Sequence, residues 1–433
     1  MAGPSTPTRV DHQAGGRNAL ATTVGMALML AGLLCNEWLV AKVMSPDGRI
    51  ESRTFRIAIG SLDATLILLG VVLATQRGRA LLRALVLRPL RRHPNVAAFL
   101  IGCAIALAMA AMVESFFFLR LAEHMRLRAD ADCECELPQG LFIADDVAGY
   151  RLPPDASARD ALTCNGEVVY DVEYQTDRFG CRVTPVDDSV PRTRFAILLG
   201  GSFTFGQRVD GDETLAAQLG RLAPIFHPYN LGCPGYGPQC ALERVRFDPL
   251  DAQIAEARGI AIYVFIDDHV DRAIGTMRVT NAWSTDMPYF TMSRDGELSR
   301  NGFLRPDRPW RTWIYRMLAK SYTVQETGFD WPPWRGENAF ELTARLVIDC
   351  RDVLAERLDL DGFYVLLYPG QPDGRRLIPW FEREGVTYLD YVDLFDAAQP
   401  EWIVPRDGHP SAKAYATLAQ QIVADLHLAT SGL

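Results

Sequence analysis

The chain has 433 residues and a formal net charge of −9, and this charge is distributed unevenly. Residues 1–128 carry 15 basic and 7 acidic side chains, a balance of +8, which leaves −17 for residues 129–433. An acidic second part repels polyanions, so nucleic acid is excluded as a partner. The length predicts two or three structural units, and the charge asymmetry favours a membrane-associated first part followed by an acidic soluble part.

Three apolar stretches of the first part predict membrane-spanning helices, because a span needs about 20 mostly apolar residues. They cover about residues 19–40, 57–75 and 96–121. The first could instead be a cleaved signal peptide, although it lacks an obvious small-x-small cleavage site. Asp63 and Glu114 lie inside the second and third stretches. One interpretation is that these two carboxyl groups serve in transport. The simpler one is that they are protonated or hydrogen-bonded to neighbouring helices.

The segment between the second and third stretches carries six arginines and no acidic residue, so the positive-inside rule keeps it in the cytoplasm. These are Arg77, Arg79, Arg83, Arg88, Arg91 and Arg92. The chain is therefore predicted to be a multi-pass protein of the inner (cytoplasmic) membrane, with its C-terminal domain in the periplasm or outside the cell. Seven of the nine cysteines lie in that domain, where disulfides would persist, but their pairing stays open. Cys133 and Cys135, spaced C-x-C, are a weak indication of a metal site.

Beyond residue 128, the sequence predicts a linker with a small β-element over 129–190 and an α/β domain over 191–433. In the second segment, apolar runs of strand length alternate with amphipathic stretches. Such alternation predicts a parallel sheet covered by helices on both sides. Residues 271–340 fit no strand–helix unit and are interpreted as an insert. The predicted strands are 195–199, 228–232, 259–266 and 362–369, and the predicted helices are 212–223, 238–248, 339–358 and 411–428.

The string "RFAILLGGSFTFG" places Ser202 directly after the first predicted strand of this domain. Gly200 and Gly201 let the backbone turn sharply and let a substrate approach closely. Ligands of parallel α/β sheets collect beyond the carboxyl ends of the strands. Ser202 is therefore a candidate nucleophile, although Gly-Gly-Ser alone is more often an ordinary loop.

A serine hydroxyl is a weak nucleophile that needs a histidine base, and the imidazole in turn needs a carboxylate to orient it. The string "PRDGHPSAKAYA" places Asp407 and His409 on a turn just before the last predicted helix. A loop at that position can return to the end of the first strand. The alternative interpretation is an ordinary Asp-Gly turn with a solvated histidine.

Four strings, in this order, resemble the motifs of the SGNH, or GDSL-like, hydrolases: "GGSFTFG", "NLGCPGYG", "YVFIDDHVDR" and "DGHPSAKAY". The resemblance covers about residues 190–430 and looks like membrane-anchored bacterial members in particular. It implies an SGNH-type, flavodoxin-like three-layer domain with a parallel sheet and no metal or organic cofactor. It also implies a catalytic triad of Ser202, His409 and Asp407.

The same resemblance implies an oxyanion hole formed by the amides of Ser202 and Gly235 and by a side chain of the third motif. The family has asparagine there, whereas this chain has Asp267, and an ionised carboxylate cannot donate a hydrogen bond. Losing one oxyanion donor costs about 10²–10³ in rate. Either Asp267 is protonated or another donor such as His269 replaces it. Two further departures are Gly201 in place of the aspartate of the first motif, and a shorter spacing in the last motif.

These patterns predict a membrane-anchored serine esterase that hydrolyses O-acetyl or lipid esters on the extracytoplasmic side. Its substrate would be an acylated glycan or lipid, with Asn230, Asp268 and His269 as possible substrate-binding residues. The alternatives are an acyltransferase acting on envelope polysaccharide through the same serine, and a catalytically inactive glycan-binding or assembly protein. Aromatic residues of the insert could stack on sugars or simply cover the sheet. They are Trp283, Tyr289, Phe290, Trp310, Trp313, Trp331 and Trp334.

Overall fold

The computed structural model describes most of the chain, which divides by its internal contacts into two units, Met1–Met112 and Val113–Leu433. The described residues are 10–34, 53–82, 94–128, 133–187, 189–282, 286–293 and 295–429. Several features named above lie outside them: residues 35–40 of the first predicted span, Trp283, and Arg83, Arg88, Arg91 and Arg92 of the arginine-rich segment.

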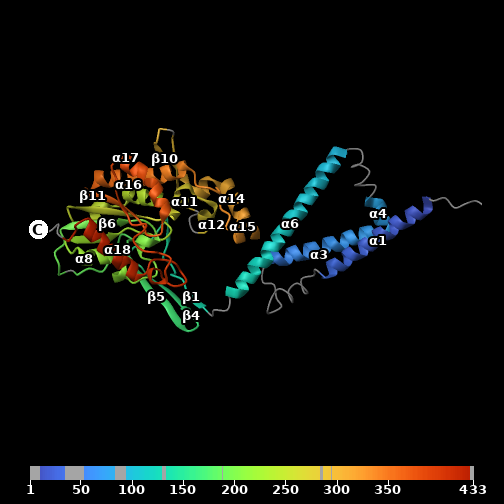
Figure 1. Cartoon of the computed structure of the whole chain (residues 1–433), viewed down its shortest axis with the longest axis horizontal. Helices are drawn as coiled ribbons and strands as arrows, with labels where there is room; N and C mark the ends of the chain where they lie inside the picture. The colour runs from blue at the N-terminus through green and yellow to red at the C-terminus, as the bar shows by residue number, and fades with distance from the viewer. Residues whose placement is uncertain are drawn as a thin grey trace, which may run out of the picture. The chain divides into compact units, whose positions relative to one another are not determined.

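The first unit is helical (Figure 1). It contains α1 (Val10–Leu34), α3 (Arg53–Ala74), α4 (Gln76–Leu82) and the first part of α6 (Pro94–Arg128). Helices α1 and α3 cross closely where glycines face each other: a Cβ atom on Gly25 would lie 2.6 Å from the carbonyl oxygen of Gly70.

The three predicted membrane spans coincide with helices α1, α3 and α6. Among the described residues, however, none of the helices is both long enough and apolar enough to cross a membrane. The prediction of three membrane-spanning helices is therefore not supported.

The second unit is built on a five-stranded parallel sheet, as the alternating pattern predicts. Its strands, in chain order, are β6 (Arg194–Leu199), β7 (Phe226–Asn230), β8 (Arg258–Phe265), β11 (Asp359–Leu367) and β12 (Thr387–Asp390). In space the order is β12-β11-β8-β6-β7, so β6 lies between β7 and β8. This is a flavodoxin-like order, in which the direction of winding reverses between the first and third strands. The carboxyl ends of β6 and β8 thus mark the expected ligand site.

Helices cover both faces of the sheet, and Figure 1 shows α16 and α17 on one side of the strands and α8 and α18 on the other. Side chains alternate along β6: Ala196 and Leu198 pack with α8 (Leu215–Leu222) and α18 (Ala412–Asp425). Phe195, Ile197 and Leu199 pack on the opposite face. There they meet α9 (Pro238–Phe247), α11 (Asp268–Ile274) and α16 (Glu337–Arg357). Burial of a central strand on both faces is typical of parallel sheets.

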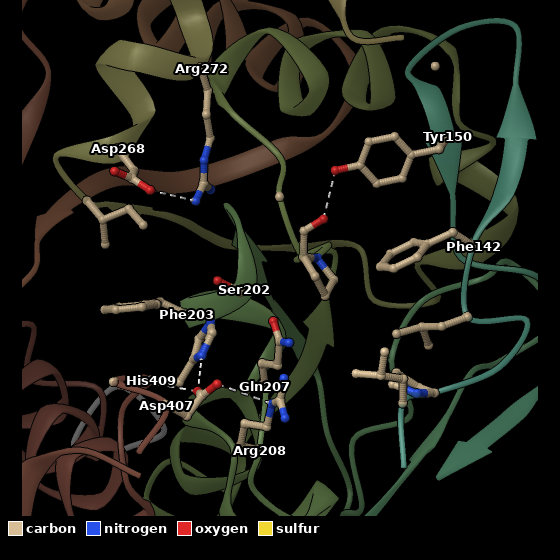
Figure 2. Close-up of a pocket in the computed structure, with 18 of the residues that line it drawn as sticks. Phe142, Tyr150, Ser202, Phe203, Gln207, Arg208, Asp268, Arg272, Asp407 and His409 are labelled. Carbon is tan, nitrogen blue, oxygen red and sulfur yellow. Dashed lines mark hydrogen bonds and ion pairs between the residues drawn. The ribbon is translucent and has the colours of Figure 1, made fainter. Parts of the chain in front are cut away.

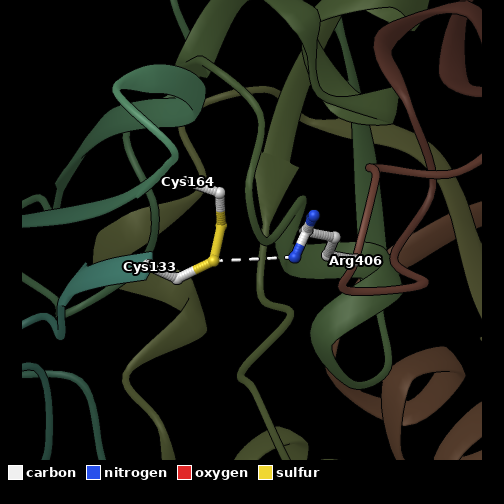
Figure 3. The surroundings of a disulfide bond; sticks show 3 residues. All are labelled: Cys133, Cys164 and Arg406. Atoms are coloured by element: carbon white, nitrogen blue, oxygen red, sulfur yellow. Dashed lines mark hydrogen bonds between the residues drawn. A yellow bond between two sulfur atoms is a disulfide. The ribbon is translucent and has the colours of Figure 1, made fainter. Parts of the chain in front are cut away.

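The segment before the sheet forms an antiparallel three-stranded sheet in the order β1-β4-β5, and a separate hairpin of β2 and β3. Their bounds are β1 (Cys133–Glu136), β2 (Ile143–Asp145), β3 (Gly149–Arg151), β4 (Ser157–Cys164) and β5 (Glu167–Gln175). A disulfide between Cys133 and Cys164 joins β1 to β4 (Figure 3).

The predicted insert contains a β-hairpin and short helices. Its elements are α12 (Met277–Ala282), β9 (Pro288–Met292), β10 (Leu298–Phe303), α13 (Leu304–Asp307), α14 (Pro309–Leu318) and α15 (Tyr322–Thr327). Of its aromatic side chains, Phe290 is buried, but Trp310, Trp313, Trp331 and Trp334 are exposed. The interpretation that these residues cover the sheet is thus wrong for the four described tryptophans. The remaining short elements are α7 (Ser202–Phe205), η2 (Gly211–Glu213), α10 (Leu250–Gln253), η3 (Pro372–Leu377), α17 (Ile378–Arg383) and η4 (Pro400–Trp402).

Candidate active site

Ser202 begins the short helix α7, directly after the sharp turn that ends β6. Gly200 has a φ of +145°, a conformation that a side chain would strain. Gly201 has no room for one, because a Cβ atom there would lie 2.6 Å from Nη1 of Arg272 and 3.0 Å from the carbonyl oxygen of Tyr236. The motif that this stretch resembles has aspartate at this position. In this chain, the guanidinium of Arg272 lies where such a side chain would begin.

Asp407 and His409 lie on the loop that precedes α18, and they contact each other directly. The Nδ1 atom of His409 is hydrogen-bonded to Oδ1 of Asp407, whose second oxygen lies 3.5 Å from Nε of Arg208. Burial alone would raise the pKa of Asp407, but the hydrogen bond from His409 and the charges of His409 and Arg208 outweigh it. The pKa of this carboxyl is thus below its usual value, and it is ionised at neutral pH.

One cavity of about 910 Å³ brings these groups together (Figure 2). Ser202, Asp407 and His409 all line it, although the serine and the histidine are separated by more than two hundred residues. The ring of Phe203, the residue after the serine, lies 5.6 Å from the imidazole of His409, centroid to centroid. The hydroxyl of Tyr415 on α18 donates to the carbonyl oxygen of Phe203, 2.9 Å away. Helix α18 thereby ties the start of α7 to the loop that carries the histidine.

Gly235, the predicted oxyanion glycine, also lines this cavity. Its φ of +83° is in the left-handed region, which favours glycine. The loop that carries it is joined to the turn after β6, because the N–H of Cys233 donates to the carbonyl oxygen of Gly200 at 3.2 Å. The two segments assigned to the oxyanion hole therefore meet at the same edge of the sheet.

Asp267 does not line the cavity, contrary to the oxyanion role considered for it. It is the N-cap residue of α11, and its carboxylate faces the backbone N–H groups of Asp373 and Gly374. Burial, together with the negative charge of Asp373, raises the pKa of Asp267 to about 6. The carboxylate therefore does not oppose an oxyanion beside Ser202.

Asp268 and Arg272 line the cavity instead, from the first turns of α11. Residues four apart lie on one face of a helix, and Nη2 of Arg272 is 3.3 Å from Oδ2 of Asp268. Nη1 of the same arginine donates to the carbonyl oxygen of Tyr236 at 2.8 Å. Burial would raise the pKa of Asp268, but Arg272 and Arg278 lower it below its usual value. An ion pair thus borders the cavity next to Gly201.

His269 and Asn230 are buried and are not among the residues that line the cavity, so their role in substrate binding stays a prediction. Nδ1 of His269 lies 3.0 Å from the hydroxyl of Tyr263, and its Nε2 atom faces Gly201 from behind. Burial and the charge of Arg272 hold the pKa of His269 well below its usual value, so the ring is neutral. Asn230 instead supports the backbone: its Nδ2 donates to the carbonyl oxygen of Thr204 at 3.1 Å, and its Oδ1 accepts from the N–H of Gly232.

Arg208 is a site residue that the sequence did not reveal. Its Nη1 atom lies 3.1 Å from Oδ1 of the fully buried Asp160 on β4, while its Nε faces Asp407. The backbone N–H of Arg208 donates to the hydroxyl of Tyr174, which in turn donates to the carboxylate of Asp160. Arg208 has a φ of +69°, and such backbone strain of about 1–3 kcal/mol persists where the surroundings impose it. The antiparallel sheet is therefore part of the support for the candidate triad.

The opposite wall of the cavity is apolar and comes from the segment predicted to be a linker and small β-element. Leu141, Phe142 and Tyr150 of that segment line it beside Pro234 of the loop after β7, and Figure 2 shows the rings of Phe142 and Tyr150 across the cavity from Ser202. The hydroxyl of Tyr150 donates to the carbonyl oxygen of Pro234 at 2.8 Å, which joins this wall to the loop of Gly235. The cavity thus has one polar and one apolar side.

The disulfide lies beside the loop of Asp407 and His409. Nη1 of Arg406 is 3.6 Å from Sγ of Cys133 (Figure 3). Arg406 has a φ of +63° and immediately precedes Asp407. The bond between β1 and β4 thus contacts the residue next to the candidate catalytic carboxylate.

Comparison with known proteins gave matches among solved structures only, since neither a family model nor a curated protein matches the chain. A lipolytic protein of the G-D-S-L family from Veillonella parvula is 11% identical, with a TM-score of 0.30, and covers 53% of this chain and 97% of its own. An acetylxylan esterase from Geobacillus stearothermophilus is 12% identical, with a TM-score of 0.30, covering 55% and 95%. An α/β hydrolase from a Lake Arreo metagenome is 12% identical, with a TM-score of 0.32, covering 56% and 98%. At such low sequence identities and TM-scores, the likeness supports no statement about function. The geometry of the site is the basis for the function proposed below.

Proposed function

We propose that this chain is a serine esterase of the SGNH type that acts on acyl esters. One observation carries the proposal: Ser202 and the hydrogen-bonded pair of Asp407 and His409 line a single cavity at the carboxyl end of β6. A nucleophile, a base and a group that orients the base are the components that acyl transfer to a serine requires. Each comes from the motif to which the sequence assigned it.

In the proposed mechanism, the Oγ atom of Ser202 attacks the ester carbonyl carbon while His409 removes the hydroxyl proton. Asp407 accepts a hydrogen bond from Nδ1 of His409, which fixes the tautomer and stabilises the imidazolium. The tetrahedral intermediate collapses, and the departing alcohol takes the proton from His409. Water then attacks the acyl-serine with His409 again as the base, which releases the carboxylic acid and restores the hydroxyl of Ser202.

The oxyanion would be stabilised by the amides of Ser202 and Gly235 and by the positive charge of Arg272. Arg272 contacts the carbonyl oxygen of Tyr236 and abuts Gly201, so its guanidinium lies between the two segments that supply these amides. Charge in a site of low water content acts strongly on a developing oxyanion. The arginine thus takes the place of the family's asparagine side chain.

The non-catalytic alternative loses its main support in this arrangement. It depended on Asp267 placing a negative charge in the oxyanion hole, and that carboxylate faces η3 instead. Acyl transfer to a sugar hydroxyl uses the same serine and remains the alternative outcome of the acyl-serine. Placement outside the cytoplasm also remains a proposal, supported by the disulfide between Cys133 and Cys164, because disulfides persist in oxidising compartments.

The proposal is tested by labelling with a fluorophosphonate probe and by hydrolysis of p-nitrophenyl esters. Ser202→Ala is expected to abolish labelling and to lower kcat by about 10⁴–10⁶-fold, as removal of a nucleophile does. Ser189→Ala is the matched control, because the hydroxyl of Ser189 is exposed and bonded only to Asp187 within its own turn. A folded wild-type chain that neither reacts with the probe nor hydrolyses any ester would overturn the proposal.

A further inference from the structure

Helix α14 presents its apolar side chains outward, which is the reverse of the usual arrangement. Its inward face carries Thr312 and Tyr315, the two residues of the helix that are buried. Its outward face carries Trp310, Trp313, Ile314 and Met317, with exposed fractions of 77%, 56%, 48% and 48%. The spacing i, i+3, i+4 and i+7 places these four on a single stripe. A contiguous apolar surface of this kind marks an interaction site rather than chance exposure.

The charge around this stripe is opposite in sign to the charge of the rest of the unit. Residues 304–320 contain five basic side chains and one acidic side chain, Asp307. The basic residues are Arg305, Arg308, Arg311, Arg316 and Lys320. Residues 129–433 as a whole have a balance of −17, so this basic cluster is a local reversal. Arg305 pairs with Asp286, and Arg308 and Arg311 donate to backbone carbonyl groups. Arg316 and Lys320 are exposed beside the stripe, so a partner with apolar groups and negative charge matches it.

Further exposed aromatic and apolar side chains lie near α14. Trp334 and Arg311 line a common hollow, and Trp334 has an exposed fraction of 76%. Directly after α14, the N-cap residue of α15, Ser321, donates from its hydroxyl to the carboxylate of Glu114. Within the same unit, this contact joins the insert to the second half of α6, where Val113, Phe116 and Leu119 are also exposed.

We propose that this surface, defined by α14 and its basic flanks, lies on a lipid bilayer with its tryptophans at the level of the headgroups. Tryptophan is enriched at membrane–water interfaces, and interfacial helices combine an apolar stripe with arginine and lysine beside it. Anionic headgroups supply negative charge to Arg316 and Lys320, which are exposed and form no ion pair with another described residue. The contact is peripheral, so it requires no membrane-spanning helix.

A second copy of the chain is a poorer occupant of this surface. An isologous dimer would place the same basic cluster against itself, and juxtaposed like charges oppose association. A neutral glycan would offer no negative charge to Arg316 and Lys320. The surface therefore fits an anionic bilayer best.

The test is tryptophan quenching in the full chain, reconstituted into phosphatidylcholine vesicles that contain a minority of phosphatidylglycerol. Acyl chains carrying bromine quench indoles that enter the bilayer. The difference between the emission of the wild type and that of Trp310→Phe/Trp313→Phe isolates the two indoles of α14. We expect this difference emission to be strongly quenched by brominated lipid and shifted to shorter wavelength. Trp402→Phe is the matched control, and it should leave the quenching unchanged.

A second variant, Arg316→Glu/Lys320→Glu, retains both tryptophans and changes only exposed side chains. It should lose a large part of the quenching at low salt, and added salt should narrow its difference from the wild type. A difference emission that is insensitive to brominated lipid overturns the proposal. Shielding of Trp310 and Trp313 from aqueous iodide in detergent also overturns the proposal. If the particle mass is doubled, a second copy covers the surface. If the protein is a monomer, the chain's own first unit covers it.

Discussion

The ends of β6 and β8 lie next to each other in the sheet, yet the residue to which the motif points lines the cavity at the first strand end and not at the second. After β6, Ser202 lies in the cavity where its motif predicts it. After β8, the motif points to Asp267, but the cavity is lined by Asp268 and Arg272. Both stretches resemble motifs of the same family, so the difference comes from the local backbone.

The backbone after β6 allows few side chains to face the cavity, because two glycines precede Ser202 and a single helical turn follows β6 at the edge of the sheet. After β8, by contrast, α11 begins at once, and the rotation of its first turn decides which of two adjacent carboxylates faces the cavity. Asp267 lies at the N-cap and turns toward η3, while Asp268 and Arg272 share the inner face. A string of residues identifies a strand end more reliably than it identifies the side chain that points into the site.

The largest expected effect tests the β6 side of this comparison. Asp407→Asn should lower kcat by about 10³–10⁴-fold, because an amide cannot stabilise the imidazolium of His409 or hold its tautomer. Steady-state hydrolysis of a p-nitrophenyl ester measures it, with Asp393→Asn, a highly exposed carboxylate, as the control. Since the pKa of Asp407 is lowered in the fold, its ionisation adds stability that is lost as pH falls. Retention of full activity by Asp407→Asn would contradict the proposed triad.

The next effect tests the β8 side. Arg272→Gln should lower kcat by about 10²–10³-fold, the usual cost of losing one oxyanion donor, with a smaller change in KM. Arg272→Lys keeps the charge and should recover part of the rate. Because Arg272 is buried, the Tm of each variant must be measured in parallel. If both variants reduce activity equally and only in proportion to the loss of folded protein, Arg272 acts through stability alone.

The fold was largely predictable from the sequence because β6, β8 and β11 are apolar runs bounded by turns, whereas β7 is a short stretch of mixed composition that was predicted over residues 228–232. The short strand β12 (Thr387–Asp390) carries too few apolar residues to be recognised in this way. That Ser202, Asp407 and His409 would line one cavity could be predicted because the chemistry proposed for them requires all three. Arg208 was not, since its role depends on a contact with Asp160 on a separate antiparallel sheet. The apolar wall was missed for the same reason: no motif marks Phe142 or Tyr150, and only folding brings them across from Ser202.

A smaller effect on activity is expected from the disulfide. Cys133→Ala/Cys164→Ala opens a link with a sequence separation of 31, which the chain-entropy relation values at about 3–4 kcal/mol of stability. Both cysteines are replaced so that neither can pair with Cys135. Denaturant unfolding measures the loss, and kcat should fall only a few-fold, through the contact of Arg406 with Cys133. Unchanged stability would show that the antiparallel sheet holds the Asp407 loop without the bond.

The smallest effect returns to Asp267 and separates the two neighbouring carboxylates. Its pKa rises from about 3.9 to about 6 on folding, so the folded state binds the proton more tightly than the unfolded state does. Stability from this group therefore falls as pH rises from about 4 to above 6. Asp267→Asn removes that loss. After allowance for partial solvent access, we expect a gain of about 1 kcal/mol above pH 6 and none near pH 4.

The activity of Asp267→Asn should stay within about two-fold of the wild type, because the side chain faces away from the cavity, and such a factor is worth only a few tenths of a kcal/mol. Melting temperatures between pH 4 and pH 8 and ester hydrolysis at pH 7 provide the two readouts. The matched variant Asp268→Asn should behave in the opposite way. It leaves Arg272 without its carboxylate partner and changes activity more than stability at neutral pH. If Asp267→Asn instead raised kcat by a hundred-fold, the carboxylate of Asp267 would lie in the oxyanion hole. The first turn of α11 would then be rotated differently from the arrangement described above.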